Sequence, residues 1–286
     1  MAAGNGLRKR APRRGRRKPR ILISNDDGVY SPGLSALADV AATLGSVKIY
    51  APDIDRASAG HSLSPNRPIA WKATRLSVEA YRVDGTPADC VALGLAQWKG
   101  VDVVLAGINL GTNLENRIWN SSTVAAAKEA ALLGSRGIAL SMAVPGDEPD
   151  YDALKPIVRR VLELLLPLDV PLLNVNFPFG RVKGFRWTRE AVCEYRSKVR
   201  SIRDPEGHRH SWFSVMRCGE PREETDVWAI EHGYVSITPL RIDLTDEPAL
   251  VGCQDSVPSA SDPKRRIHPS GRHRIARTTA RERKRR

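Results

Sequence analysis

Short apolar runs alternate with stretches of helical periodicity along the first two thirds of the chain. Residues 21–23 form the first run, and residues 34–44 then carry apolar side chains with helical spacing. A second apolar run follows over 47–50, so strand, helix and strand fall within about 30 residues. Such a βαβ unit places its two strands parallel to each other. The pattern therefore predicts an α/β fold with a largely parallel sheet.

The same pattern continues further along the chain. It predicts strands over 79–83, 101–106, 138–141 and 172–176, and helices over 87–98, 124–133 and 151–166. Thr86 as N-cap, Pro87 at the first helical position and Asp89 two residues later are start signals for the second helix. Beyond Pro178 we expect shorter strands over 182–189, 211–217, 226–230 and 233–240. The expected organisation is a core over 20–177 with a β-rich, antiparallel extension over 178–250 that could mediate oligomerisation.

The first apolar run ends abruptly in Asn25-Asp26-Asp27-Gly28. In parallel sheets, ligands bind beyond the carboxyl ends of the strands. Two carboxylates at such an end are hard oxygen ligands that suit Mg²⁺ or Mn²⁺. Gly28 permits a sharp turn and a close approach by a ligand. The alternative is an ordinary polar loop in which Asp27 caps a helix.

Three later loops carry polar side chains at the ends of predicted strands. The loop 53–68 contains Arg56, Ser58, His61 and Ser62, any of which could face the acidic pair, although a lone loop histidine such as His61 is more often a surface residue. Asn109 and Asn113 follow the strand 101–106, where an amide can bind a metal or a phosphate. The hydroxyls of Ser121, Ser122 and Thr123 precede an alanine-rich helix, where free N–H groups favour phosphate. Simple N-capping explains these hydroxyls as well.

Composition narrows the class of protein. The chain has 286 residues, of which 41% are hydrophobic, so it can bury a substantial core. Its apolar runs are far shorter than the roughly 18 residues of a membrane span, and we expect no membrane partner. The four cysteines are scattered without a C-x-x-C pair, which is typical of reduced thiols in a cytoplasmic protein.

The net charge of +13 is concentrated at the two ends of the chain. Residues 1–20 hold nine Lys or Arg and no acid, and residues 264–286 hold eleven and one acid, so residues 21–263 carry −6. Basic segments so poor in apolar residues are expected to be disordered, which predicts tails over 1–19 and 251–286. They could contact polyanions without sequence preference, or act only as solubilising extensions.

Several motifs together, in the same order along the chain, resemble the SurE family of survival-protein nucleotidases. The matching residues are 25–28, 51–53 with Arg56, 60–62, 85–90, 107–113, Ser121 with 123–124, and 233–239. The match covers roughly residues 20–250 and leaves the basic tails outside. A dinucleotide-binding dehydrogenase is disfavoured, because the first βα connection lacks G-x-G-x-x-G.

The resemblance implies a Rossmann-like, three-layer α/β/α fold and a divalent-metal phosphatase that acts on nucleoside monophosphates. It implies 5′-nucleotidase activity, with 3′-nucleotidase and short-chain polyphosphatase activity as possible additions, and a homodimer or homotetramer built through the C-terminal extension. One Mg²⁺ or Mn²⁺ per subunit would be bound by Asp26, Asp27 and Asn109, and these two acids would be catalytic. Asn25, Asn113 and His61 would line the substrate pocket, and Ser121, Ser122 and Thr123 would bind the phosphate.

Two positions depart from the family pattern. The serine that follows the loop arginine as a metal ligand is replaced by Ala57, and a serine stands one place later, at Ser58. The ligand position then falls to Ser58 or to water. The family's Ser-Gly-Thr phosphate motif reads Ser121-Ser122-Thr123, with a side chain added at the middle position. A second hypothesis follows, in which the chain is a degenerate, non-catalytic member that binds nucleotides or polyanions.

Overall fold

The computed structural model describes residues 17–144, 146 and 149–254. The chain divides into two compact units, Met1–Ile242 and Asp243–Arg286. The first unit holds every strand found in the described ranges, and the described part of the second contains helix α6 (Glu247–Gln254). Most of both predicted basic tails, 1–19 and 251–286, lies outside the described residues. No helix within the described ranges is long and apolar enough to cross a membrane.

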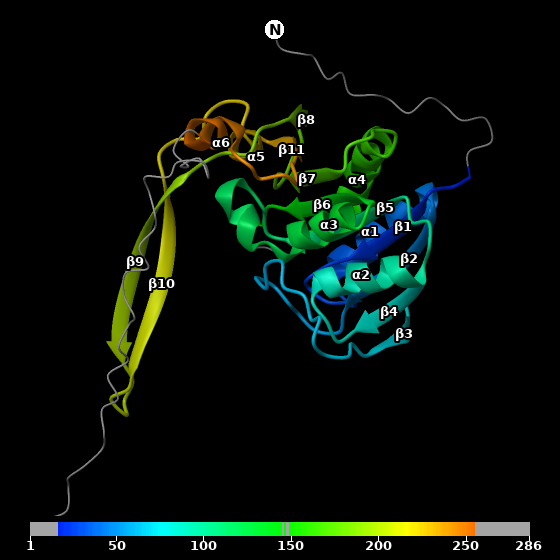
Figure 1. Ribbon diagram of the computed structural model, residues 1–286, viewed down its shortest axis with the longest axis horizontal. Coiled ribbons are helices and arrows are strands. Elements are labelled where there is room, and N and C mark those ends of the chain that lie inside the picture. The colour runs from blue at the N-terminus through cyan, green and yellow to red at the C-terminus, as the bar shows by residue number, and fades with distance from the viewer. Residues whose placement is uncertain (1–16, 145, 147–148, 255–286) are drawn as a thin grey trace, which may run out of the picture. The chain divides into compact units, whose positions relative to one another are not determined.

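A nine-stranded sheet forms the centre of the first unit, with the strand order β3-β4-β2-β1-β5-β6-β7-β11-β8 (Figure 1). All neighbouring pairs are parallel except β3 with β4 and β7 with β11. The bounds are β1 Arg20–Ser24, β2 Ser46–Pro52, β3 Trp71–Arg75, β4 Glu79–Val83, β5 Val103–Leu110, β6 Arg136–Met142, β7 Leu172–Phe177, β8 Gly184–Trp187 and β11 Tyr234–Pro239.

Helices cover both faces of this sheet and make three layers. The helices of the first unit are α1 (Pro32–Leu44), α2 (Pro87–Gln97), the 3₁₀ helix η1 (Glu115–Asn120), α3 (Ser122–Leu132), α4 (Tyr151–Leu165) and α5 (Asp226–Glu231). Helices α1 and α4 pack together on one face, and α2 and α3 pack together on the other. Successive residues of β1 serve the two resulting cores, because Ile21 and Ile23 join the α1 and α4 side while Leu22 joins the other.

Local sequence signals account for the helix starts on which the site depends. Thr86 and Asp89 form a complete capping box at the start of α2, as the sequence predicts. Ser121 caps α3 by accepting a hydrogen bond from the Val124 N–H. Gly137 of β6 lets α3 lie close to the sheet, since a Cβ there would collide with the Ala127 carbonyl. Because helices cover both faces of the sheet, the prediction of a three-layer α/β/α fold is confirmed.

The segment after Pro178 differs in part from the sequence expectation. Residues 226–230 were expected to be a strand but belong to helix α5, which Thr225 caps through the Trp228 N–H. Strands β8 and β11 join the central sheet, and their mutual pairing is parallel. The division of the chain at 177/178 into a core and an extension stays a prediction.

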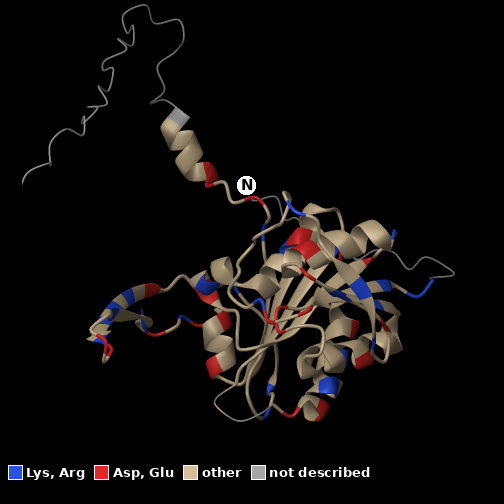
Figure 2. Ribbon diagram, turned by 90° about the horizontal axis from the view of Figure 1, so that it is seen from below, with Lys and Arg blue, Asp and Glu red and all other residues tan. Residues whose placement is uncertain are grey.

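Two long strands form a separate antiparallel ribbon, β9 (Glu194–Arg203) with β10 (Arg209–Cys218) (Figure 1). Their pairing gives the extension the antiparallel element that the sequence predicts, although β9 itself was not expected. Basic and acidic residues both occur along the ribbon (Figure 2). Large apolar side chains on it, among them Val199 and Phe213, are exposed.

Candidate active site

The acidic pair lies where β1 ends, at the carboxyl edge of the parallel sheet. Strand β1 ends at Ser24, and Gly28 turns the backbone with a φ of +98° that favours glycine. The Val29 N–H then bonds the Pro52 carbonyl at 2.8 Å, which fastens the turn to β2. Asp26 is buried and Asp27 is half-buried. The turn therefore presents both carboxyl groups from one rigid position.

Burial and mutual repulsion make the negative charges at this position costly. Burial raises the pKa of Asp26 above its ordinary value, against the hydrogen bond from Thr123. Burial, together with the charges of Asp26 and Asp55, raises the pKa of Asp27 to about 6. No ion pair within the described ranges includes Asp26 or Asp27. The donor set fits a hard divalent cation, which would hold both carboxylates in the charged form.

Asn109 supplies a third oxygen at the same edge. It stands near the end of β5, the strand that pairs with β1, and its Nδ2 donates to the Gly111 carbonyl at 2.7 Å. This contact fixes the side-chain amide, and no hydrogen bond to its Oδ1 is found among the described residues. Asn25 makes similar contacts, since its Nδ2 donates to the Gly28 carbonyl and to the Ser31 hydroxyl. Its buried Oδ1 has no hydrogen-bond partner in the described part of the chain.

The start of α3 meets the acidic pair directly. The Thr123 hydroxyl donates to Oδ1 of Asp26 at 2.7 Å, and both side chains are buried. Because the first turn of a helix has N–H groups without intrahelical acceptors, this end of α3 favours an anion. The Ser121 hydroxyl is the N-cap, and the Ser122 hydroxyl bonds the loop after β2. The backbone N–H groups of the turn, rather than its hydroxyls, are therefore left for a phosphate.

The loop after β2 is attached to both neighbouring elements. The Arg56 N–H bonds the Asp26 carbonyl at 2.8 Å, and His61 Nε2 lies 2.7 Å from Oε2 of Glu129 on α3. Ser58 is exposed, with a φ of +58°, and its hydroxyl takes part in no hydrogen bond found among the described residues. Ala57, at the family's ligand position, is also exposed. His61 is thus brought to α3, where it holds a buried carboxylate.

Asn113 is fastened to the ends of the next two strands. Its Nδ2 donates to the Ser141 hydroxyl at 2.8 Å, and its N–H donates to Oδ1 of Asn176 at 2.8 Å. The Asn113 carbonyl accepts from the side-chain amides of Asn174 and Asn176. These contacts span β6 and β7 and set the position of the loop that follows Asn109. In this structure Asn113 organises the loop.

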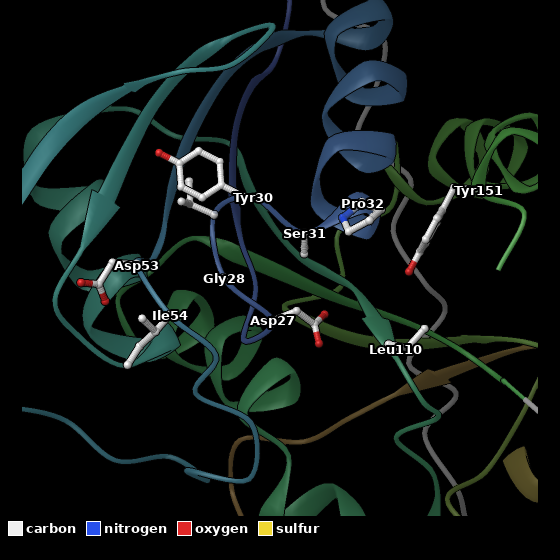
Figure 3. Close-up of a pocket in the computed structure, with 10 residues that line it drawn as sticks. Asp27, Gly28, Tyr30, Ser31, Pro32, Asp53, Ile54, Leu110 and Tyr151 are labelled. Carbon is white, nitrogen blue, oxygen red and sulfur yellow. The ribbon is translucent and has the colours of Figure 1, made fainter. Parts of the chain in front are cut away.

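A pocket of about 390 Å³ opens beside Asp27. Figure 3 shows Asp27 between two groups of side chains, with Tyr30 and Ile54 on one side and Leu110 and Tyr151 on the other. Apart from Asp27 and Asp53, its large lining side chains are apolar or aromatic. A carboxylate beside an apolar wall of this kind suits a ligand that has one charged and one flat, apolar end.

One further group of possible metal ligands occurs in the described ranges, and it lies elsewhere. Asp204, Glu206 and His208 come together at the turn between β9 and β10. The Asp204 carboxylate there already accepts from His208 and from His210, at 3.2 and 2.8 Å. These contacts explain why Asp204 and the two histidines lie together without an ion.

Comparison with known proteins identifies the family of the chain. The family model described as "Survival protein SurE" matches residues 21–197. The chain belongs to the SurE family. A SurE relative named 5′-nucleotidase SurE 1, from Thermus thermophilus, is 44% identical over 79% of this chain and 93% of its own length. A second, 5′-nucleotidase SurE from Archaeoglobus fulgidus, is 39% identical over 79% and 92%.

A solved SurE structure shows the same fold. The crystal structure of the SurE protein from Aquifex aeolicus aligns with a TM-score of 0.73 at 35% sequence identity. The alignment covers 84% of this chain and 98% of that one. The resemblance to the SurE family, with the fold that it implies, is therefore confirmed over the body of the chain.

For several residues at this site the sequence analysis predicted no role. No role was expected for Glu129, which receives His61, or for Asp55, whose charge acts on Asp27. Asn174 and Asn176 carried a usable signal, because they are polar residues within a strand that is otherwise apolar and wholly buried. Tyr30 and Tyr151 had no signal, since they are distant in sequence and the fold alone brings them to one pocket.

Proposed function

We propose that this chain is a divalent-metal-dependent phosphatase that hydrolyses nucleoside monophosphates, a 5′-nucleotidase. The hydrogen bond between Thr123 and Asp26 carries the proposal, because it joins the acidic pair to the anion-binding start of α3. A phosphate monoester needs its oxygens neutralised and a water molecule positioned for attack. The acidic edge and the helix start supply these two requirements side by side. The names of the relatives support the same activity.

Asp26, Asp27 and Oδ1 of Asn109 would hold one Mg²⁺ or Mn²⁺. A bound divalent ion would neutralise a phosphoryl oxygen and lower the pKa of a water molecule. The N–H groups of Ser122 and Thr123 would bind the other phosphoryl oxygens, with Ser121 holding the helix start in place. The half-buried Asp27, which lines the pocket, is the better placed of the two acids to accept a proton from water.

The pocket beside Asp27 would take the nucleoside. Its aromatic and apolar walls at Tyr30, Ile54, Leu110 and Tyr151 offer surfaces on which a base can pack. This position leaves the phosphate toward Asp27 and the base against the apolar walls. Activity on 3′-nucleotides and on short polyphosphate is part of the proposal, because the acidic pair and the helix start recognise the phosphate and not the sugar.

Substitution of Asp27 tests the assignment. Asp27→Asn removes a charged ligand while keeping its size, so we expect phosphate release from a nucleotide panel with Mn²⁺ or Mg²⁺ to fall by at least about 10- to 100-fold. The matched control is Asp169→Asn, because Asp169 is an exposed aspartate outside the site. Full activity in Asp27→Asn with an unchanged metal requirement would remove Asp27 from the ligand set. If the unmodified chain showed no metal-dependent release of phosphate, the proposed enzymatic activity would be refuted.

We propose that the ribbon of β9 and β10 pairs with a second copy of the chain to form a homodimer or homotetramer. A two-stranded ribbon alone is marginally stable in water, and Val199 and Phe213 on one face are 61% and 68% exposed. Val199→Ser combined with Phe213→Ser should lower the mass measured by light scattering. An unchanged mass would place the interface elsewhere.

We further propose that the basic termini contact polyanions and take no part in nucleotide hydrolysis. A chain limited to residues 20–255 should keep its rate on nucleoside monophosphates and lose salt-sensitive binding to polyphosphate or nucleic acid. A large fall in that rate for the folded, shortened chain would contradict this assignment.

A further inference from the structure

We propose that Ser122 is a positioning residue, whose hydroxyl closes the turn over residues 56–59 against the start of α3 and so holds the loop after β2 in its working place. The inference rests on the proposed function for its link to catalysis. Its structural half, that the hydroxyl holds the turn, stands on contacts of this chain and can be tested without any activity.

The Ser122 hydroxyl bonds both ends of a tight turn. It accepts from the Ala59 N–H at 2.9 Å and donates to the Arg56 carbonyl at 3.2 Å. Arg56 and Ala59 are the first and fourth residues of that turn, whose ends a direct hydrogen bond joins in an ordinary β-turn. One side chain from α3 thus ties together the two ends of a loop that is more than 60 residues away in sequence.

The turn needs such support because its own geometry is unfavourable. Ser58, its third residue, has a φ of +58°, a conformation that favours glycine. Ala57 and Ser58 are both exposed, so packing does little to hold the corners. Ser122 is fully buried, and removal of its hydroxyl would leave a half-buried donor at Ala59 and a half-buried acceptor at Arg56 without that partner. We therefore expect the turn to open when the hydroxyl is removed.

Opening of the turn would disturb the acidic pair, because two hydrogen bonds connect the turn to the surroundings of Asp26 and Asp27. The N–H of Arg56, the first residue of the turn, bonds the Asp26 carbonyl at 2.8 Å. Asp55 accepts from the Ala57 N–H at 2.7 Å, so the same turn sets the position of a third carboxylate near Asp27. Ser122 therefore acts on the site through Arg56 and Asp55, in addition to the backbone N–H that it offers at the helix start.

Limited proteolysis measures the structural half. Trypsin cuts after Arg56 only when the turn opens, and the cleavage rate follows the open population when reclosing is fast. Loss of two hydrogen bonds predicts a rise of about 5- to 100-fold in the rate of cleavage after Arg56 in Ser122→Ala. Cleavage after Arg75, at the exposed end of β3, should stay unchanged. Mass spectrometry distinguishes the two cuts from those at the termini.

Two further variants separate positioning from general stability. Ser236→Ala is the matched control. Ser236 lies in β11, is as buried as Ser122, and its hydroxyl forms a hydrogen bond of 2.7 Å with the Thr188 hydroxyl. It should lower the melting temperature without exposing Arg56. Ser122→Thr keeps the hydroxyl and should restore slow cleavage. Equal cleavage after Arg56 in Ser122→Ala and in the unmodified chain, or in Ser122→Ala and Ser236→Ala, would overturn the proposal.

Direct Mn²⁺ titration and steady-state kinetics measure the functional half. We expect Ser122→Ala to bind Mn²⁺ about tenfold more weakly and to raise KM, with kcat at saturation changed by less than about threefold. An open turn with unaltered Mn²⁺ binding and KM would overturn the positioning role. If the unmodified chain released no phosphate, the proposed function would fail, whereas the proteolysis would still decide whether Ser122 holds the turn.

Discussion

The substitution Glu190→Gln should make the protein more stable in alkaline solution and leave its stability in acid almost unchanged. Glu190 is half-buried near two other acids, Asp226 and Glu115. Burial, followed by the charges of these two acids, raises the pKa of Glu190 from 4.5 to about 7. The folded protein therefore favours the neutral carboxyl group.

The sign follows from proton linkage. Between pH 4.5 and about 7 the folded state holds a proton that the unfolded state releases, so the free energy of unfolding falls as the pH rises. The stabilisation is complete below 4.5 and is lost once the pH passes about 7. The full shift corresponds to about 3 kcal/mol at 1.36 kcal/mol per pKa unit. Solvent screening of a partly exposed group reduces this to about 1–2 kcal/mol.

Glutamine keeps the shape of glutamic acid and carries no charge at any pH. At pH 8.5 we expect the variant to melt about 2–8 °C above the unmodified protein, and at pH 4.5 to melt within about 1 °C of it. Thermal unfolding followed by circular dichroism measures both values, with Glu220→Gln as the exposed control. Equal stabilisation at the two pH values, or destabilisation at pH 8.5, would show that the charge at Glu190 is not opposed by its neighbours.

Three other outcomes follow from the site. Thr123→Val keeps the shape of the side chain but removes the donor to Asp26, so Mn²⁺ binding measured by calorimetry should weaken about 10- to 100-fold, whereas Thr123→Ser should bind normally. Ala57→Ser should lower the Mn²⁺ concentration that gives half-maximal rate. Ser58→Ala should raise that concentration sharply only if Ser58 has taken over the ligand role. If neither substitution changes the metal dependence, this turn does not contact the metal. Chelation by EDTA should abolish phosphate release and lower the melting temperature, because the acidic pair then loses its compensating cation, and added Mn²⁺ should restore both.

Much of the fold and part of the site could be derived from the sequence. The run that ends in Asp26-Asp27-Gly28 predicts a strand end with an acidic turn, and the structure places one there. The capping box of Thr86 and Asp89 is equally local, since its partners are three residues apart. Such features are encoded within a few residues, because propensity, periodicity and capping act over one or two turns of chain.

Only the tertiary structure decided which polar groups meet. Residues 226–230 have the composition of a strand but form α5, which Thr225 caps locally and whose first residue, Asp226, also accepts N–H groups from the distant Glu115 and Ala191. The Ser122 hydroxyl could have been an ordinary helix-start group, yet it closes a turn from another loop. Sequence spacing determined where most strands end and most helices begin. The packing of α3 against the sheet decided which side chains share the buried space between this helix and the sheet. The reason is that a buried donor or acceptor must find a partner wherever the fold places one.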